Sequence, residues 1–293
     1  MFKGSIPAIV TPMQADGAVD YPAWERLLDY HVAEGTDALV VGGTTGESPT
    51  LEEAELVQLV RRAKERVGAR MPIIAGSGTN CTKKTIALSK AMVAAGADGL
   101  LLVTPYYNKP TQEGLFRHFT AVADAVSAPI ILYNVPGRTA CDLLPETVVR
   151  LSRHPNIVGI KEATGDLSRA PAILGQARPG FLLLSGDDPT AAELMKLGAC
   201  GVISVTANVA PRAVHDLCAA ALSGNHVEAA RLSEKLMPLH LAMFVEANPI
   251  PVKWAVARLG LIGPGIRLPL TALSERLENE VLAAMKAAGI RGP

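Results

Sequence analysis

The sequence has few aromatic residues and no excess of charge of either sign, and both features argue against certain classes of binding protein. Aromatic side chains make up 4% of the 293 residues, and 28 Lys and Arg balance 28 Asp and Glu. Nucleic-acid binding usually needs a basic face, and single strands also need aromatic surfaces on which bases stack. A neutral chain also has no basic patch for an anionic membrane. We therefore expect no nucleic-acid partner and no membrane partner.

Cysteine is scarce, and no hydrophobic run is long enough to cross a bilayer. The four cysteines form no CxxC pair, which argues against a zinc ribbon or a thioredoxin-like motif. Such scattered thiols suit a reducing compartment better than a disulfide framework. The most apolar stretch, residues 91–103, is interrupted by Asp98. Since the N-terminus also lacks the long apolar segment of a signal peptide, the sequence predicts a cytoplasmic protein.

Metal-binding and nucleotide-binding motifs are also missing. The six histidines form neither an HxH nor an HExxH pattern, and most fall in stretches with helical spacing. We interpret them as core or surface residues and expect no metal. No Gly-Lys-Ser/Thr follows a glycine-rich turn, so a Walker A loop is absent.

Short apolar runs recur along the first three quarters of the chain and alternate with amphipathic stretches. The eight runs are residues 6–10, 38–41, 73–75, 99–103, 130–133, 157–160, 181–185 and 201–205. They are continuous, as is typical of strands buried on both faces of a parallel sheet. Eight strand–helix units predict a (β/α)₈ barrel. A doubly wound sheet is the alternative, but the first run is followed by Thr11-Pro12-Met13 and not by a glycine-rich turn.

The helical stretches between the runs carry start signals. Helical spacing covers residues 21–34, 52–67, 82–95 and 111–126, with expected N-terminal caps at Asp20, Thr50, Thr82 and Thr111. After residue 224 the apolar runs stop, and residues 225–244, 249–259 and 270–289 read as three further helices. We therefore expect a catalytic barrel of residues 1–224 and a small helical C-terminal extension of residues 225–293.

Lys161 is the strongest functional signal in the sequence. It directly follows the sixth apolar run, and barrel enzymes place their active sites at the carboxyl ends of strands. An amine that is partly desolvated there is a nucleophile suited to forming a Schiff base with a carbonyl substrate. The structural alternative is a lysine that pairs with Glu162 or Asp187 and merely closes the barrel.

Other strand ends carry weaker signals. Thr44 and Thr45 lie in a glycine-rich turn that can bind an anion such as a carboxylate, although it also fits an ordinary loop. Tyr133 can relay protons or simply form a buried hydrogen bond. Arg138 can bind a carboxylate in bidentate fashion or lie on the solvated surface. Asp188, before Pro189, is expected to cap the next helix.

Three motifs together resemble one enzyme family. Gly43-Thr44-Thr45-Gly46-Glu47, Tyr133-Asn134-Val135-Pro136-Gly137-Arg138-Thr139 and Gly159-Ile160-Lys161-Glu162-Ala163 are similar to those of the dihydrodipicolinate synthase and N-acetylneuraminate lyase family. The resemblance extends from Gly4 to Lys253. It implies a class I aldolase on a (β/α)₈ barrel, with pyruvate as one substrate and no metal or organic cofactor.

The resemblance also implies roles for individual residues. Lys161 would form the imine with pyruvate, and Tyr133, Thr44 and Tyr107 would relay protons. In the family the tyrosine at position 107 reaches in from a neighbouring subunit, which implies a homo-oligomer, usually a dimer of dimers.

Residues for substrate binding follow in the same way. Thr45 would bind the pyruvate carboxylate, Arg138 would bind the carboxylate of L-aspartate 4-semialdehyde, and Gly186 and the Ile203 carbonyl would line the pocket. Thr44-Thr45, Tyr106-Tyr107 and Arg138 favour the branch that condenses pyruvate with this semialdehyde, the first committed step of the diaminopimelate route to lysine.

Some family members are inhibited by lysine, and the resemblance covers that site only in part. Ser48, Asn80 and Tyr106 match the site, whereas Lys84 replaces a glutamate, and Glu53 and Leu56 replace histidines. Because Lys84 would repel the ammonium group of lysine, we expect weak or no inhibition.

Three alternatives remain at this point. A sugar-acid lyase of the same family would share Lys161 and Tyr133 but take another aldehyde. A catalytically silent barrel acting as a binding or scaffold protein would not need the complete Lys, Tyr and Thr set. A phosphate-binding barrel would show a glycine-rich loop after strand seven or eight, where Asp187 and Asp188 would repel phosphate.

Overall fold

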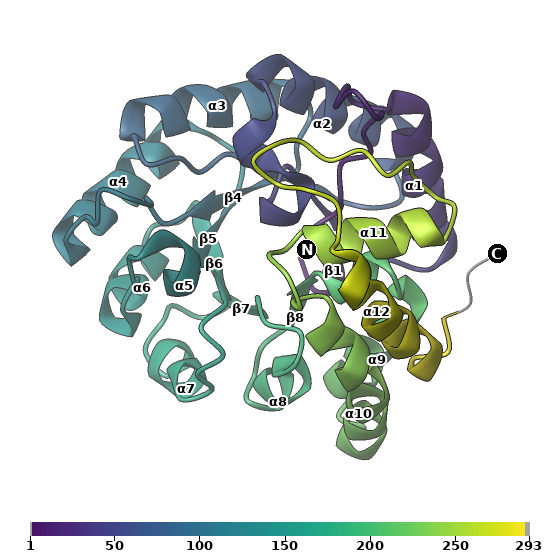
Figure 1. Ribbon diagram of the computed structural model, residues 1–293. Coiled ribbons are helices and arrows are strands. Elements are labelled where there is room, and N and C mark those ends of the chain that lie inside the picture. Colours follow the sequence, from purple (N-terminus) through teal and green to yellow (C-terminus); the bar gives the residue numbers. More distant parts are fainter. Residues whose placement is uncertain (1, 291–293) are drawn as a thin grey trace.

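The computed structural model describes residues 2–290 and contains eight parallel strands arranged as a barrel within a ring of helices (Figure 1). Consecutive strands from β2 to β8 are neighbours, and β8 pairs with β1. A parallel β-bridge between Ala8, just after β1, and Val40 in β2 links the first two strands and closes the barrel. The predicted (β/α)₈ barrel is confirmed. The strands are β1 (Gly4–Pro7), β2 (Leu39–Val41), β3 (Ile73–Gly76), β4 (Gly99–Val103), β5 (Ile130–Asn134), β6 (Ile157–Glu162), β7 (Leu182–Ser185) and β8 (Gly201–Ser204).

Helices follow every strand, and several are short. The helices associated with the barrel are α1 (Tyr21–Ala33), α2 (Glu53–Val67), α3 (Thr82–Ala94), α4 (Gln112–Ala125), α5 (Pro136–Thr139), α6 (Pro145–Ser152), α7 (Arg169–Leu174), α8 (Ala191–Lys196) and α9 (Pro211–Leu222). Three 3₁₀ turns are added at strand ends, namely η1 (Thr44–Gly46), η2 (Ser48–Thr50) and η3 (Thr206–Asn208). Within residues 2–290, no helix has both the length and the apolarity needed to cross a membrane.

Two of the four predicted helix caps are confirmed. The side chains of Asp20 and Thr111 each accept the backbone N–H three residues further on. Thr50 instead belongs to η2, and α2 is capped by Glu52 in a reciprocal capping box. Thr82 is the first residue of α3 and not its cap. The two wrong predictions are each within two residues of the true boundary, where local sequence is least decisive.

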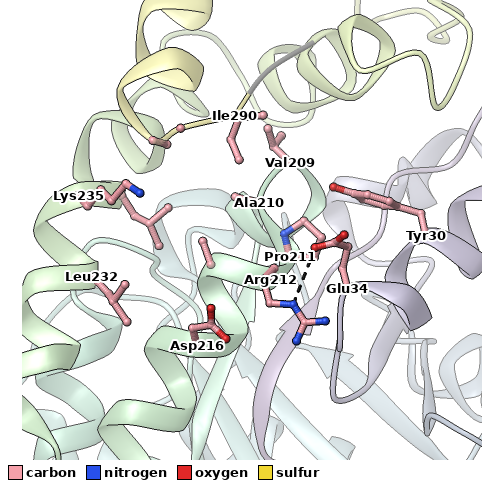
Figure 2. A pocket seen from close by; sticks show the side chains of 14 residues that line it. Tyr30, Glu34, Val209, Ala210, Pro211, Arg212, Asp216, Leu232, Lys235 and Ile290 are labelled. Atoms are coloured by element: carbon pink, nitrogen blue, oxygen red, sulfur yellow. Dashed lines mark ion pairs between the residues drawn. The ribbon is translucent and has the colours of Figure 1, made fainter. Parts of the chain in front are cut away.

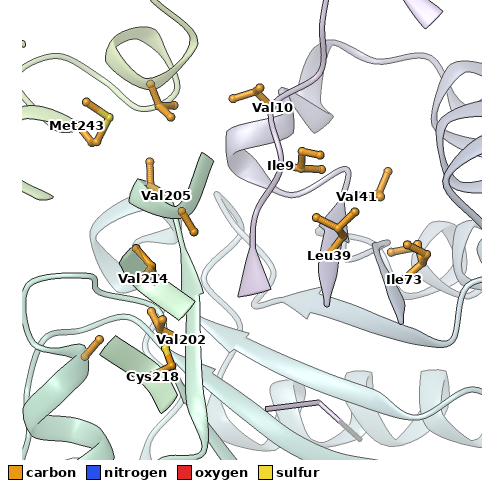
Figure 3. Packing of buried hydrophobic residues seen from close by; sticks show 14 of the residues in the cluster. Ile9, Val10, Leu39, Val41, Ile73, Val202, Val205, Val214, Cys218 and Met243 are labelled. Carbon is orange, nitrogen blue, oxygen red and sulfur yellow. The ribbon is translucent and has the colours of Figure 1, made fainter. Parts of the chain in front are cut away.

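The hydrophobic core has two layers that follow from the alternation of side chains along each strand. Outward-facing residues such as Leu39, Val41 and Ile73 pack against the helices (Figure 3). Inward-facing residues such as Val40 and Ile203 fill the barrel, and Tyr133 belongs to this inner cluster. The interior of the barrel is therefore a packed core.

The C-terminal segment forms the three expected helices, α10 (His226–Ala242), α11 (Ile250–Arg258) and α12 (Glu275–Ala287). After α11 the chain returns to the α1–α2 side of the barrel (yellow in Figure 1). There the Arg267 guanidinium donates to both carboxylate oxygens of Glu55, at 2.6 and 2.7 Å, and to the Thr50 carbonyl at 2.6 Å. The boundary at residue 224 stays a prediction.

Candidate active site

Lys161 and Tyr133 lie side by side at the carboxyl ends of neighbouring strands. They are register partners between β6 and β5, and Lys161 is within β6 and not just after it. The Lys161 Nζ lies 4.3 Å from the centroid of the Tyr133 ring. Both side chains are buried, with exposed fractions of 5% and 7%. An amine and a phenol thus share one buried space at the barrel mouth.

Gly186, directly after β7, leaves room for the lysine side chain. A Cβ at this position would lie 2.7 Å from Lys161 Cε and 2.5 Å from Ala163 Cβ, closer than real Cβ atoms approach. Ile203 lies on β8 in the same inner cluster as Tyr133. The structure therefore brings Lys161, Tyr133 and Gly186 together. The expected pocket-lining roles of Gly186 and Ile203 stay predictions, since neither lines the cavity described below.

The alternative role for Lys161, an ion pair that closes the barrel, does not fit the structure. Among residues 2–290 no carboxylate pairs with its ammonium. Glu162 accepts a hydrogen bond from Arg169 Nε at 2.9 Å, and Asp187 accepts one from the Thr190 hydroxyl at 2.7 Å. Both candidate partners are thus engaged elsewhere.

A buried polar network on the outer side of β5 and β6 was not predicted. Asn134 follows Tyr133 and Glu162 follows Lys161, so their side chains point away from the barrel interior. The Asn134 amide donates to Asp142 at 2.8 Å, and Arg169 binds Asp142 at 3.1 Å as well as Glu162. The network ties together the two strand ends that carry Lys161 and Tyr133. Its only sequence signal is the presence of polar residues at the ends of apolar runs.

The loop that carries Thr44 and Thr45 is attached to the C-terminal extension. The side-chain amide of Asn248 donates to Thr45 Oγ1 at 3.0 Å. Glu47, at the end of η1, is 1% exposed and forms an ion pair with Lys253 on α11, which is 4% exposed. Sequence reasoning did not predict that Asn248, Lys253 and Glu47 hold this loop, because the sequence contains no signal that connects positions so far apart.

Arg138 and Tyr107 differ in their positions relative to this site. Arg138 lies on the short helix α5, and its Nη2 donates to the backbone carbonyl of Asn248 at 3.4 Å. Tyr107 is 89% exposed, with a left-handed φ of 76°. The structure thus places Arg138 beside the residue that binds Thr45, whereas it leaves Tyr107 on the surface.

A cavity of about 640 Å³ opens beside these residues. It is lined by Thr44, Tyr133 and Arg138 of the predicted active site. The same cavity is lined by five positions of the predicted lysine site, namely Ser48, Glu53, Leu56, Lys84 and Tyr106. Asn80 does not line it, although its backbone carbonyl accepts a hydrogen bond from Asn108 at 2.8 Å. The two predicted sites are therefore neighbours around one space.

A second cavity, of about 270 Å³, lies between α1, α9, α10 and the end of the described chain (Figure 2). Its charged side chains include Glu34 and Arg212, which form an ion pair at 4.0 Å. None of the predicted site residues lines it. It is separate from the candidate active site.

The prediction that Asp188 caps the next helix is wrong. Its Oδ2 accepts the backbone N–H groups of Val205 and Thr206, at 2.8 and 3.0 Å, and so binds the start of η3 after the next strand. Asp187 binds Thr190 in the turn before α8. Since both carboxylates occupy this corner, it does not suit a phosphate group. Within residues 2–290, no cluster of three His, Cys, Asp or Glu has a geometry for a metal.

Comparisons with known proteins agree on one family. The model of the dihydrodipicolinate synthetase family matches residues 1–288. The 4-hydroxy-tetrahydrodipicolinate synthase of Stutzerimonas stutzeri (strain A1501) is 56% identical over 290 residues, covering 99% of each chain. A solved structure of chloride-inhibited dihydrodipicolinate synthase from Acinetobacter baumannii with pyruvate is 52% identical, with a TM-score of 0.98 and coverage of 99% and 100%. Another, described as the first monomeric dihydrodipicolinate synthase variant, is 44% identical, with a TM-score of 0.96 and coverage of 99% and 98%.

Proposed function

The chain belongs to the dihydrodipicolinate synthetase family, and on this premise we propose that Lys161 is the amine that binds pyruvate in its reaction. The protein is a lyase that condenses pyruvate with L-aspartate 4-semialdehyde to 4-hydroxy-tetrahydrodipicolinate, on the diaminopimelate route to lysine. The observation that carries the assignment of Lys161 is its position beside Tyr133 in the barrel mouth, with Nζ 4.3 Å from the ring.

The reaction starts with nucleophilic attack by the neutral Lys161 amine on the ketone carbon of pyruvate. Loss of water gives an iminium ion, which acts as an electron sink, so that the methyl carbon loses a proton and an enamine forms. The enamine carbon attacks the aldehyde of the second substrate and forms the new carbon–carbon bond. The amine of that substrate then displaces Lys161 and closes the ring.

Each step moves protons, and we assign these transfers to Tyr133, Thr44 and Tyr107. The position of Tyr133 supports a role in proton transfer, because its ring faces the Lys161 amine and because it lines the same cavity as Thr44. Tyr107 is too exposed to act within its own chain as described, so it would complete the relay in a second copy. We therefore propose a homo-oligomer, with a dimer as the minimal unit and a dimer of dimers as the full assembly.

Both substrates carry a carboxylate, and two residues are proposed to bind them. Thr45 would donate its hydroxyl to the pyruvate carboxylate, and Arg138 would bind the carboxylate of the semialdehyde. Gly186 and the Ile203 carbonyl would complete the pocket. A sugar-acid aldehyde is the less favoured second substrate, since the relatives described above carry the name of the synthase.

The test is trapping of the imine with borohydride. The wild-type protein incubated with pyruvate and borohydride should gain one reduced pyruvate adduct on Lys161, detected by mass spectrometry, and Lys161→Ala should gain none. An adduct that persists on the variant would contradict the assignment of Lys161 as the imine-forming residue. Turnover of pyruvate with aspartate semialdehyde, N-acetylmannosamine and glyceraldehyde in parallel then identifies the aldehyde, with activity expected on the semialdehyde alone.

Two further proposals concern regulation and location. Ser48, Asn80 and Tyr106 retain part of a lysine site, but we propose weak or no inhibition because Lys84 faces the same cavity and repels the ammonium of lysine. Strong inhibition by micromolar lysine in the activity assay would contradict this.

A cytoplasmic location is proposed from the four free thiols, which suit a reducing compartment.

A further inference from the structure

Asn248 contacts both residues proposed to bind a substrate carboxylate. Its side-chain Nδ2 donates to Thr45 Oγ1 at 3.0 Å, and its backbone carbonyl accepts from Arg138 Nη2 at 3.4 Å. The residue is 6% exposed. Its Oδ1 has no hydrogen-bond partner in the described part of the chain, so the contact with Thr45 is the one hydrogen bond of the side-chain amide there.

The chemistry of an amide N–H sets the direction of this hydrogen bond. An N–H group only donates, so the Thr45 oxygen must be the acceptor. The hydroxyl proton of Thr45 is then free to donate to another group. A carboxylate accepts hydrogen bonds and does not donate them. The Thr45 hydroxyl is thus set in advance as a donor for a carboxylate.

The backbone around Asn248 is fixed at the same end of the barrel. Lys253, one turn into α11, forms the buried ion pair with Glu47 at the end of η1. The segment that carries Asn248 and the loop that carries Thr45 are therefore held together at two points. The distance between the amide and the hydroxyl does not depend on a single contact.

We propose that Asn248 is a positioning residue that fixes the Thr45 hydroxyl as a hydrogen-bond donor to the carboxylate of pyruvate. The proposal rests on the proposed function, in which Thr45 binds this carboxylate. Asn248 itself does not take part in the bond changes. It acts through Thr45 and lowers the cost of binding pyruvate before the imine forms.

The experiment uses the isosteric variant Asn248→Asp, which keeps the shape of the side chain and reverses the hydrogen bond. A carboxylate at this position accepts the Thr45 hydroxyl proton and also repels the carboxylate of pyruvate. The readout is the pyruvate concentration that gives half-maximal borohydride trapping, which requires no second substrate. Since a hydrogen bond to a charged group is lost, we expect this concentration to rise about tenfold to a hundredfold. Trapping at saturating pyruvate should be retained.

Three controls separate orientation from packing. Asn248→Ala removes the donor without reversing it, so its effect should be smaller than that of Asn248→Asp. Asn225→Asp makes the same chemical change at an exposed helix cap and should bind pyruvate like the wild type. In Thr45→Val, the further change Asn248→Ala, which adds no charge, should have a much smaller effect than in the wild-type protein, because the hydroxyl through which Asn248 acts is gone.

The outcomes are distinct. A larger effect in Asn248→Ala than in Asn248→Asp would show that packing matters and would overturn the proposal, as would full additivity with Thr45→Val. If Asn248→Asp does not fold, judged by thermal unfolding, the coupling is still tested by comparing the effect of Asn248→Ala in the wild-type protein with its effect in Thr45→Val. Failure of the proposed function would appear separately, as the absence of an adduct in the wild-type protein.

Discussion

Alternation along a strand explains how the site residues are held. Tyr133 and Lys161 point into the barrel, and the residues that follow them, Asn134 and Glu162, point outward into a buried polar network. The outward residues carry the structural hydrogen bonds, and the inward residues are the ones to which we assign the chemistry. One residue of displacement along either strand would exchange these roles.

Gly186 provides a test at the scale of one residue. In Gly186→Ala the new methyl group meets Lys161 Cε at 2.7 Å, so the lysine side chain must move. We expect the rate of imine trapping with pyruvate to fall by about fivefold to a hundredfold, which corresponds to the roughly 1–3 kcal/mol typical of overpacking. Gly114→Ala, in the first turn of α4, serves as the control and should trap pyruvate at the wild-type rate. Equal rates in Gly186→Ala and the wild type would contradict a tight fit around Lys161.

At the scale of elements, the C-terminal extension is part of the site's framework. Helix α11 supplies Lys253 to Glu47, and the segment beyond it supplies the Arg267 backbone N–H to the same carboxylate at 3.1 Å. Burial lowers the pKa of Lys253, while the adjacent Glu47 carboxylate opposes the shift. A buried pair of this kind is costly to break from one side only.

Lys253→Met should therefore destabilise the protein. The variant keeps the length of the side chain but leaves Glu47 buried without its cation, and we expect a loss of about 3–5 kcal/mol in the free energy of unfolding, measured by urea denaturation. The double variant Lys253→Met/Glu47→Gln should recover part of the loss, because it removes the unpaired charge. Arg231→Met, which breaks an exposed ion pair with Glu228, should change little. A loss no larger than that of Arg231→Met would show that the pair does not hold α11 to the loop.

At the scale of the whole molecule, the exposure of Tyr107 leads us to predict that two chains share each active site. Lys161→Ala and Tyr107→Phe should each be nearly inactive alone. In a mixed dimer, one site combines an intact Lys161 with an intact Tyr107 from the other chain. Co-expression of the two variants in equal amounts should restore about a quarter of wild-type turnover, since half of the dimers are mixed and one of their two sites is complete. No recovery in a mixed oligomer isolated by two affinity tags would place the relay within one chain.

Buried histidines predict how stability depends on pH. Burial lowers the pKa of His31 to about 3 and that of His118 to about 4, from 6.5 in an unfolded chain. The unfolded chain therefore binds more protons below pH 6.5. Each histidine contributes stability that is complete above pH 6.5 and falls by about 1.4 kcal/mol per unit as the pH decreases towards its folded pKa. Urea denaturation of His31→Leu between pH 7 and pH 5 should show a shallower loss than the wild type, whereas the exposed His226→Gln should follow the wild type. Parallel curves for His31→Leu and the wild type would contradict the prediction.

The sequence by itself determined the barrel and the positions of Lys161 and Tyr133. Both depend on short-range patterns: apolar runs of strand length, helical spacing between them, and the rule that catalytic groups follow strand ends. The same reasoning erred at Thr50, Thr82 and Asp188, where the partner of a polar side chain depends on the local path of the chain or on a different strand. Short-range patterns do not contain that information.

Only the tertiary structure decided which distant segments complete the site. Asn248 and Thr45 are 203 residues apart in the sequence, and Lys253 and Glu47 are 206 apart. Their contacts arise because the barrel closes and the C-terminal helices then pack against its outer side and mouth. The sequence around one residue of such a pair does not indicate which residue will be its partner. A buried amide or ammonium can bind any suitable group that the fold brings within reach. Closure of the barrel, and not the composition of any one segment, determines these pairs.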